Sequence, residues 1–257
     1  MKIWYQSSMA LGDPHFEPYE EFLKKHVQEC TKPGTTVVVN GVKAHHPGMT
    51  HSSYIESLNA GGAIDNAIQA EREAYDAFAF GCMTDPAHQH IRECVSIPVA
   101  FALETNIHLA CLLADRFTFL SHHPWLLQRA EELIKEYGLW ERYVPAGYHE
   151  FPEMDPMENF EDPTHLVKSI TEQAKEAASK GASMLILSCL ICTAALLHHG
   201  IRAIDAIPIL DSSGVVAKTA EFLAEIKEIG IDRSQRGLRA PLPREEVLEA
   251  RKLWGLE

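Results

Sequence analysis

The chain contains one short plan twice, and this repeat limits the folds open to it most strongly. Residues 74–82 read AYDAFAFGC and residues 181–189 read GASMLILSC, so each run has small residues, an apolar strand and then a cysteine. A helical stretch and an Ile-Pro strand follow each run, at Ile97-Pro98-Val99 and Ile207-Pro208-Ile209. Strands that alternate with helices are typical of βαβ units and parallel sheets. The repeat therefore predicts two similar α/β halves.

The predicted elements alternate along the whole chain. Strands are predicted at residues 1–5, 35–39, 77–81, 98–103, 116–121, 143–148, 183–188 and 207–210. Helices are predicted at residues 17–29, 62–74, 86–94, 106–113, 124–137, 165–179, 193–199 and 214–229, with a polar tail and a short helix at 241–257.

We expect an α/β fold of two pseudo-symmetric Rossmann-like lobes with parallel sheets. Residues 1–96 plus 207–257 are expected to form the first lobe and residues 97–206 the second. Ligands of open α/β sheets bind outside the carboxyl ends of the strands. The active site is therefore expected in the cleft between the two lobes.

The charge balance disfavours several kinds of partner. With 23 Lys and Arg against 36 Asp and Glu, the formal net charge is −13 and no basic cluster is visible. Such a surface does not attract nucleic acid or an anionic membrane. No run reaches the roughly 18 apolar residues of a membrane span, and the first residues do not read as a secretory signal. We expect a cytoplasmic protein whose six cysteines are reduced thiols.

Cys82 and Cys189 differ from the other cysteines because they occupy matching positions at strand ends. Backbone N–H groups and the positive end of a helix dipole stabilise a thiolate at such a junction. Thr84-Asp85-Pro86 follows Cys82 and predicts a capped helix start. Two thiols on opposite sides of an acidic carbon can remove one proton and deliver another, which is racemisation without a cofactor. Ordinary packing is expected for three further cysteines, Cys30, Cys94 and Cys111.

These motifs resemble the Asp/Glu/hydantoin racemase superfamily and, within it, the hydantoin-racemase-like branch. The resemblance covers most of residues 1–229. In the first half it rests on Cys-x-x-Asp-Pro at 82–86 and on Ile97-Pro98-Val99 with Glu104 following. Further along the chain it rests on residues 116–118, 181–189 and 208–211. It implies two pseudo-symmetric α/β domains, no cofactor, and Cys82 with Cys189 as the acid and base pair. It also implies a hydantoin or an amino-acid-like small molecule as the substrate.

The sequence departs from the family pattern at several positions. Ser188 precedes the second cysteine where glycine is usual, and counting back from Ile207-Pro208 selects Cys192 instead of Cys189. Residues 5–8 replace an Asn-Pro pair, and residues 44–54 are unusually rich in histidine. Other members decarboxylate, isomerise a cis double bond or hydrolyse amides through one thiol. A thiol-dependent lyase or hydrolase therefore stays open, as does a two-lobed binding protein.

Substrate-binding candidates lie where loops should reach the cleft. Hydroxyl groups can hold a carboxylate or an imide, and residues after strands lie at the binding edge of a sheet. The candidates are Ser7, Ser8, Ser53, Tyr54, Thr84, Glu104, Ser121, His122 and Asp211. His45, His46 and His51 form a weaker case for an imidazole that faces substrate.

We expect neither a metal nor a cofactor, because no pair among the fourteen histidines has the spacing of a recognised metal site. A small-molecule substrate is the expected partner, and the protein is expected to form a homo-oligomer.

Overall fold

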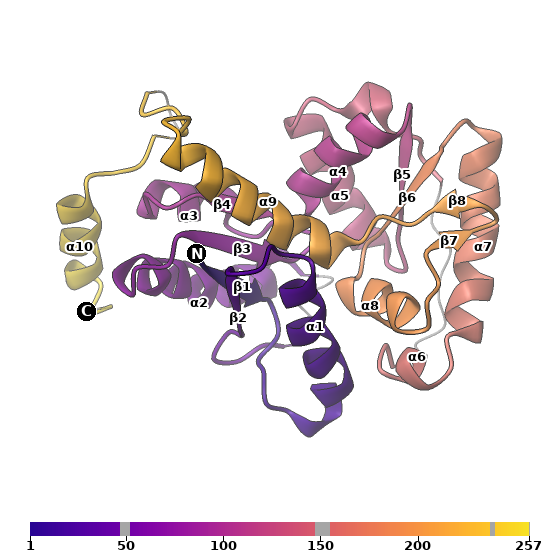
Figure 1. Ribbon diagram of the computed structural model, residues 1–257, viewed down its shortest axis with the longest axis horizontal. Coiled ribbons are helices and arrows are strands. Elements are labelled where there is room, and N and C mark those ends of the chain that lie inside the picture. The colour runs from indigo at the N-terminus through magenta and orange to yellow at the C-terminus, as the bar shows by residue number, and fades with distance from the viewer. Residues whose placement is uncertain (47–51, 147–154, 237–239, 257) are drawn as a thin grey trace.

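The computed structural model describes residues 1–46, 52–146, 155–236 and 240–256, which form two lobes that each contain a parallel sheet (Figure 1). The first sheet has the strand order β2-β1-β3-β4. Its strands are β1 (Lys2–Ser7), β2 (Thr36–Asn40), β3 (Ala77–Gly81) and β4 (Val99–Phe101). All five residues of β3 are buried, as expected for a central parallel strand that helices cover on both faces.

Helices cover both faces of this sheet. The helices α2 (Ser53–Arg72) and α3 (His88–Cys94) belong to the face on which Trp4, Phe78 and Phe80 are buried. On the other face lie α1 (Glu17–Glu29), which follows the short 3-10 helix η1 (Pro14–Phe16), and α9 (Ser212–Glu228). Because side chains alternate along a strand, Ile3 and Tyr5 face α1 and α9 while Trp4 faces the opposite layer.

The second lobe repeats the strand order of the first. β5 (Phe117–Leu120) and β6 (Met184–Leu187) pair in parallel, and single parallel bridges join Phe117 to Tyr143 and Leu185 to Ile209. Numbered by sequence, these four segments have the order 2-1-3-4, which is the order of the first sheet. The predicted pseudo-symmetry is therefore confirmed.

The second lobe carries most of the remaining helices. They are α4 (Ala102–Leu113), α5 (Pro124–Glu136), η3 (Trp140–Arg142), α6 (Glu158–Glu161), α7 (Thr164–Ser179) and α8 (Leu190–His198). A small antiparallel pair, β7 (Ala203–Ile204) and β8 (Ile207–Pro208), precedes α9. After α9 the chain ends in α10 (Arg244–Leu253), which lies against the first lobe (Figure 1).

The chain crosses between the lobes later than the sequence predicts. β4 pairs with β3, so residues 97–101 belong to the first lobe and not to the second. Ile209 pairs with Leu185, so the chain returns to the first lobe only with α9 and not at residue 207. Both differences arise because an Ile-Pro strand extends the sheet that its preceding cysteine-bearing strand belongs to.

Some predicted boundaries also move. α8 begins at Leu190 and not at Thr193, which leaves Cys189 as its N-cap residue. α3 begins at His88, two residues after the predicted start. The predicted strand at 143–148 is reduced to the bridge at Tyr143, and residues 147–154 lie outside the described residues.

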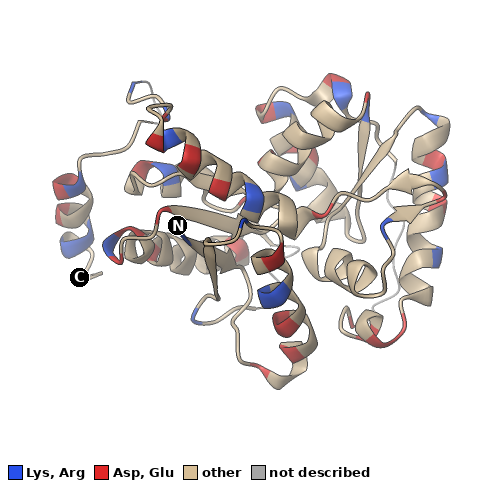
Figure 2. Ribbon diagram, in the orientation of Figure 1, with Lys and Arg blue, Asp and Glu red and all other residues tan. Residues whose placement is uncertain are grey.

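Acidic and basic residues both occur along α1, α7, α9 and α10 (Figure 2). Within the described ranges, no helix combines the length and the apolar character needed to cross a bilayer.

Gly81 shows how closely β1 and β3 pack beside the first candidate thiol. A Cβ at Gly81 would lie 2.3 Å from the Tyr5 hydroxyl oxygen, whereas a Cβ at Gly61 in α2 would meet nothing within 4 Å. We expect Gly81→Ala to lower the free energy of unfolding by roughly 1–3 kcal/mol, because the buried Tyr5 ring must move. Gly61→Ala, the matched control, is expected to raise it by about 0.5–1 kcal/mol. Urea denaturation measures both values, and an unchanged stability of Gly81→Ala would contradict this packing.

Candidate active site

The two candidate thiols occupy equivalent places in the two lobes. Cys82 follows β3 and Cys189 follows β6, and each of these strands is the third of its lobe. Ser7 pairs with Gly81, so Ser8 continues beside Cys82. Leu120 pairs with Leu187, so His122 continues beside Cys189 in the same register. One polar side chain therefore accompanies each thiol at the carboxyl edge of its sheet.

The surroundings of Cys82 favour the neutral thiol. Burial raises its pKa to about 11, and the negative charge of Glu56 acts in the same direction. Hydrogen bonds from Thr84 and Ser8 oppose this rise, and the Thr84 hydroxyl oxygen lies 3.4 Å from the sulfur. Cys82 is therefore protonated at neutral pH, with two hydroxyl groups ready to stabilise a thiolate.

Cys189 lies in surroundings that favour the thiolate. A hydrogen bond from the Cys192 thiol is the largest cause, and backbone N–H groups of Ile191 and Cys192 add to it, so that the pKa of Cys189 is lowered to about 7 despite burial. The positive end of the α8 dipole favours the same charge. The same contact raises the pKa of Cys192. Cys189 therefore lies at the end of β6. Cys192 lies in the first turn of α8 and donates a hydrogen bond to the Cys189 sulfur.

Tyr19 of α1 lies within electrostatic reach of both thiols. Burial raises its pKa, and nearby Tyr5, Cys189 and Cys82 raise it further, while a hydrogen bond with Ser7 lowers it. Helix α1 contacts α8 of the second lobe as well as β2 of the first (Figure 1). The sequence did not single out Tyr19, because a tyrosine on the apolar face of an amphipathic helix reads as an ordinary core residue.

Asp85 joins the Cys82 loop to the start of α4. Its carboxylate accepts hydrogen bonds from the backbone N–H groups of Leu103 and Glu104, both at 2.8 Å, and from the Tyr137 hydroxyl at 2.9 Å. Burial nevertheless raises the pKa of Asp85 to about 7. The predicted cap of the following helix is therefore wrong, since Asp85 has a positive φ of 41° and caps α4 instead of α3.

Two charged side chains meet near Cys82 from opposite lobes. Glu56 of α2 interacts with Thr84, and burial raises its pKa while the positive charge of Arg129 in α5 lowers it. Among the described residues, no group hydrogen-bonds to Glu56 Oε1 or to Arg129 Nε, although both atoms are buried. Asn59, one turn after Glu56, donates to the carbonyl of Ser8 at 3.1 Å. The sequence did not single out any of these three residues.

Residues 19–231 match the model of a family described as Asp/Glu/hydantoin racemase. The chain belongs to this family. It is 26% identical over 210 residues to a hydantoin racemase from Pseudomonas sp. (strain NS671), a match that covers 79% of this chain and 80% of the relative. It is also 26% identical over 184 residues to a hydantoin racemase from Paenarthrobacter aurescens, over 70% of this chain and 75% of that protein.

Solved structures of allantoin racemases share the fold. The enzyme from Klebsiella pneumoniae superposes with a TM-score of 0.74 at 21% identity, covering 95% of this chain and 94% of that one. The enzyme from Pseudomonas fluorescens gives a TM-score of 0.76 at 20% identity, over 95% and 98% of the two chains. The expected resemblance and the two-lobed fold class are therefore both confirmed.

Several predicted site residues are engaged away from the two thiols. Ser53 and Tyr54 lie in the first turn of α2, and both are exposed, Tyr54 at 72%. Glu104 accepts two hydrogen bonds from Arg92. Asp211 caps α9 through the Gly214 N–H and contacts His26 at 2.7 Å. The structure thus does not join these four candidates to Cys82 or Cys189, because helix geometry and ion pairing direct their side chains elsewhere.

The remaining candidates have local partners. Ser121 donates to the His123 carbonyl and accepts from its N–H, which is ordinary turn chemistry. His122 Nδ1 lies 3.1 Å from the Ser188 hydroxyl, and burial lowers the pKa of His122 to about 4, so the imidazole is neutral. His45 accepts a hydrogen bond from the Ala10 N–H, and His51 lies outside the described residues.

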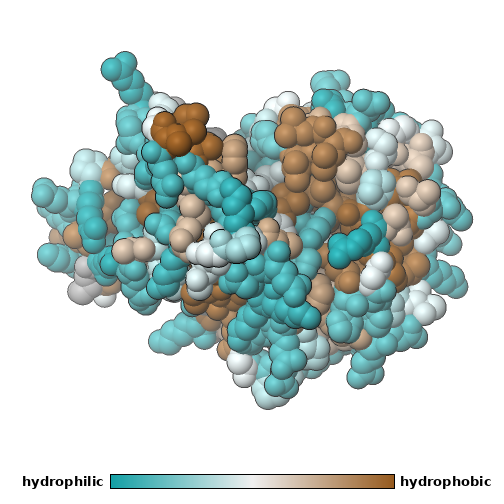
Figure 3. Space-filling view, in the orientation of Figure 1, coloured by the Kyte–Doolittle hydropathy of each residue, from teal (hydrophilic) through white to brown (hydrophobic). Residues whose placement is uncertain are grey.

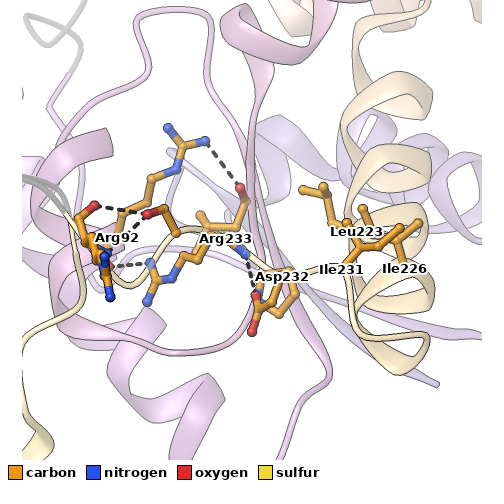
Figure 4. A pocket seen from close by; sticks show the side chains of 10 residues that line it. Arg92, Leu223, Ile226, Ile231, Asp232 and Arg233 are labelled. Atoms are coloured by element: carbon orange, nitrogen blue, oxygen red, sulfur yellow. Dashed lines mark hydrogen bonds between the residues drawn. The ribbon is translucent and has the colours of Figure 1, made fainter.

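A separate cavity of about 440 Å³ lies between β4, α9 and the segment after α9 (Figure 4). Two of the guanidinium groups that line it already have structural partners. Arg233 donates to the carbonyls of Arg92 and Val95, and Arg92 pairs with Glu104. Neither candidate thiol lines this cavity, so we do not assign the active site to it.

The different surroundings of the thiols predict different reactivities. At pH 8 we expect iodoacetamide to label Cys189 at least about tenfold faster than Cys82, because the larger thiolate fraction outweighs the lower nucleophilicity of a low-pKa thiolate. The Cys189 rate should rise through pH about 7 and then level off. Peptide mass spectrometry measures both rates.

Cys192→Ala should move the rise of the Cys189 labelling rate to higher pH, because the variant loses the thiol donor. Cys111→Ala, which changes a cysteine on α4, is the matched control and should leave the pH dependence of Cys189 labelling unchanged. Equal labelling of Cys82 and Cys189 across the pH range would refute the asymmetry.

Proposed function

We propose that this protein is a cofactor-independent racemase or epimerase that acts on a hydantoin or an amino-acid-like small molecule through Cys82 and Cys189. Membership of the family identifies the chain as an enzyme, and the relatives that it matches are racemases. The observation that carries the two-thiol scheme is the equivalent position of the two cysteines, each directly after the third strand of its lobe. The lower pKa of Cys189 than of Cys82 supports the division into base and acid. A racemase of this kind needs one base and one acid on opposite faces of a carbon.

The proposed reaction starts at Cys189. Its thiolate removes the proton from the carbon next to a carbonyl group, and the electron pair of the C–H bond moves into that carbonyl. The Cys82 thiol then gives its proton to the opposite face of the same carbon, which forms the mirror-image centre. This leaves Cys82 as a thiolate, which the hydroxyl groups of Thr84 and Ser8 stabilise. The opposite enantiomer is converted from that state by the reverse sequence.

Glu56 and Arg129 each have a buried atom without a hydrogen-bond partner among the described residues, which favours a substrate with both hydrogen-bond donors and acceptors. Buried polar groups in native proteins almost always have a hydrogen-bond partner. The buried Glu56 Oε1 and Arg129 Nε lack one among the described residues. The charge of Glu56 raises the pKa of Cys82, and the charge of Arg129 lowers the pKa of Glu56. A cyclic imide or ureide offers an N–H to the carboxylate and a carbonyl to the guanidinium. Glu56 and Arg129 are therefore our choice for the residues that orient the substrate.

Solvent hydrogen exchange tests the proposed function. In deuterium oxide, the wild-type protein should exchange the hydrogen at the stereocentre of one enantiomer of a 5-substituted hydantoin and lose optical rotation at the same time. Cys82→Ser and Cys189→Ser should each lower the racemisation rate by at least about a thousandfold, because a hydroxyl is a far weaker acid and base than a thiol. Polarimetry and proton NMR measure the two processes.

Cys111→Ser is the matched control and should retain the wild-type rate. Cys192→Ser is expected to retain measurable activity, since it changes only the donor to Cys189. Release of carbon dioxide or ammonia that needs only one of the two thiols would instead favour the lyase or hydrolase alternative. Ligand binding without exchange for any substrate would leave a binding protein.

Substitutions at Glu56 and Arg129 test their role in substrate binding. We expect Arg129→Gln and Glu56→Gln to raise KM by about tenfold or more, because each loses a hydrogen bond to a charged group, worth about 1.5–3 kcal/mol. Glu132→Gln is the matched control, since Glu132 Oε2 lies 3.8 Å from Arg129 Nη1 and the Glu132 side chain is half exposed. Its KM should stay within about twofold of wild type. An unchanged KM in both Glu56→Gln and Arg129→Gln would contradict this assignment.

The cytoplasmic location and the homo-oligomer remain predictions. Apolar side chains gather over α4 at the top of one lobe (Figure 3), where Leu112 is 82% exposed. Phe222 on the neighbouring α9 is 54% exposed. A homo-oligomer would use such a surface.

A further inference from the structure

Three side chains with metal-binding atoms meet between α1 and α9, apart from the proposed thiol pair. His26 Nε2 lies 2.7 Å from Asp211 Oδ2, and Cys30 Sγ lies 3.7 Å from the same histidine nitrogen. Cys30 Sγ lies 3.9 Å from the same carboxylate oxygen. Three donor atoms of different chemistry thus converge on one point.

The arrangement does not suit a nucleophilic Cys-His-Asp triad. In such a triad the thiol and the carboxylate contact opposite nitrogens of the imidazole, so that the ring can pass a proton between them. Here both Cys30 and Asp211 contact Nε2 of His26. Convergence on a single ring nitrogen is the pattern of ligands that face a common centre.

We propose that His26, Cys30 and Asp211 bind a divalent transition metal ion, with Zn²⁺ as the best fit. Ideal tetrahedral bonds to zinc place sulfur about 3.6 Å from both nitrogen and oxygen, and nitrogen about 3.4 Å from oxygen. The two sulfur distances of 3.7 and 3.9 Å already match these values. Only the His26 to Asp211 hydrogen bond, at 2.7 Å, has to open by less than about 1 Å when the ion enters.

The ligand set also suits zinc chemically. Thiolate, imidazole and carboxylate are all ligands of Zn²⁺, whereas Mg²⁺ and Ca²⁺ prefer sites made only of oxygen atoms. Three protein ligands leave a fourth position for water or another small ligand.

The local fold brings the three ligands together. His26 lies in the last turn of α1 and Cys30 is the C-cap residue of this helix, still with helical backbone angles, so the two residues, four apart, lie on one face. Asp211 is the N-cap of α9, and its Oδ1 accepts the Gly214 N–H while Oδ2 faces His26. A Cβ at Gly214 would lie 2.8 Å from Cys30 Sγ and 2.6 Å from Asp211 Oδ2. Glycine at this position keeps the space beside the ligands open.

An ion can reach the ligands from a groove. Cys30, Asp211 and Gly214 line a groove of about 900 Å³ between α4 and α9, which also contains Glu104 and His108. The proposed site also joins the two lobes, because α1 packs on the first sheet and Asp211 directly follows the segment that pairs with β6 of the second. A bound ion would stabilise the segment around Asp211, where the chain returns from the second lobe to the first.

Sequence pattern alone does not predict this site. The sequence predicts ordinary packing for Cys30 and a substrate-binding role for Asp211. A His-x3-Cys spacing alone does not indicate a metal site. Only the fold brings Asp211, from the far end of the sequence, to the other two.

Cobalt substitution tests the proposal. The protein is freed of metal with EDTA, dialysed, and titrated with Co²⁺ and then with Zn²⁺. We expect one equivalent of Co²⁺ to produce a thiolate-to-cobalt charge-transfer band, Zn²⁺ to displace it, and Zn²⁺ to raise Tm because it binds only the folded state. Cys30→Ser should abolish the band, and His26→Gln and Asp211→Asn should weaken Zn²⁺ binding at least about tenfold. Cys94→Ser, the matched control, should bind as the wild type does.

Two outcomes would overturn the proposal. One is the absence of both the band and a Zn²⁺-dependent rise in Tm for the metal-free wild type. The other is a band that survives Cys30→Ser and is lost in Cys192→Ser, which would place the ion at Cys189 and Cys192. Gly214→Ala adds an independent check, since a Cβ there should lower Zn²⁺ affinity even though all three ligands remain. Circular dichroism spectra confirm that each variant is folded.

Discussion

Hydrogen bonds at the first turn of α8 favour the thiolate form of Cys189, and the proposed chemistry depends on this thiolate. The Cys192 thiol and two backbone N–H groups supply these bonds. At the equivalent Cys82, burial and the charge of Glu56 outweigh the hydrogen bonds from Thr84 and Ser8, so the pKa is raised and the thiol stays protonated. The duplicated fold provides two strand ends, and the loops after them create the difference between base and acid. A pair of equally ionised thiols could not serve as both.

In the loop after Cys82, the Asp85 side chain does not cap the next helix, α3, but contacts the start of α4 in the other lobe. In the second lobe the helix starts directly after Cys189, whereas in the first lobe Asp85 turns away and caps α4. The Tyr137 hydroxyl holds the same carboxylate. Cys82 therefore lacks a helix N-terminus of its own, which agrees with its raised pKa. The geometry of one loop thus links the lobe arrangement to the protonation of the site.

Much of the fold could be predicted from the sequence, since apolar runs and Ile-Pro strands mark the parallel sheets. The strand ends at Cys82 and Cys189, and their neighbours Ser8 and His122, follow from local pattern and register. Ser53, Tyr54, Glu104 and Asp211 stay predictions as substrate-binding residues. The structure does not join them to either thiol, because their orientation depends on helix starts and on partners distant in sequence. Tyr19, Glu56 and Arg129 were missed for the same reason: only the packing of α1, α2 and α5 gives them a place near the thiols.

The central claim is that Cys82 and Cys189 face one carbon atom from opposite sides. A crystal structure with a planar analogue of the deprotonated substrate tests it most directly. The account predicts that both sulfur atoms lie about 3–3.5 Å from the carbon that stands for the stereocentre, one on each face of the ring. A complex in which only one sulfur approaches that carbon, or in which Cys192 replaces Cys189, would contradict it.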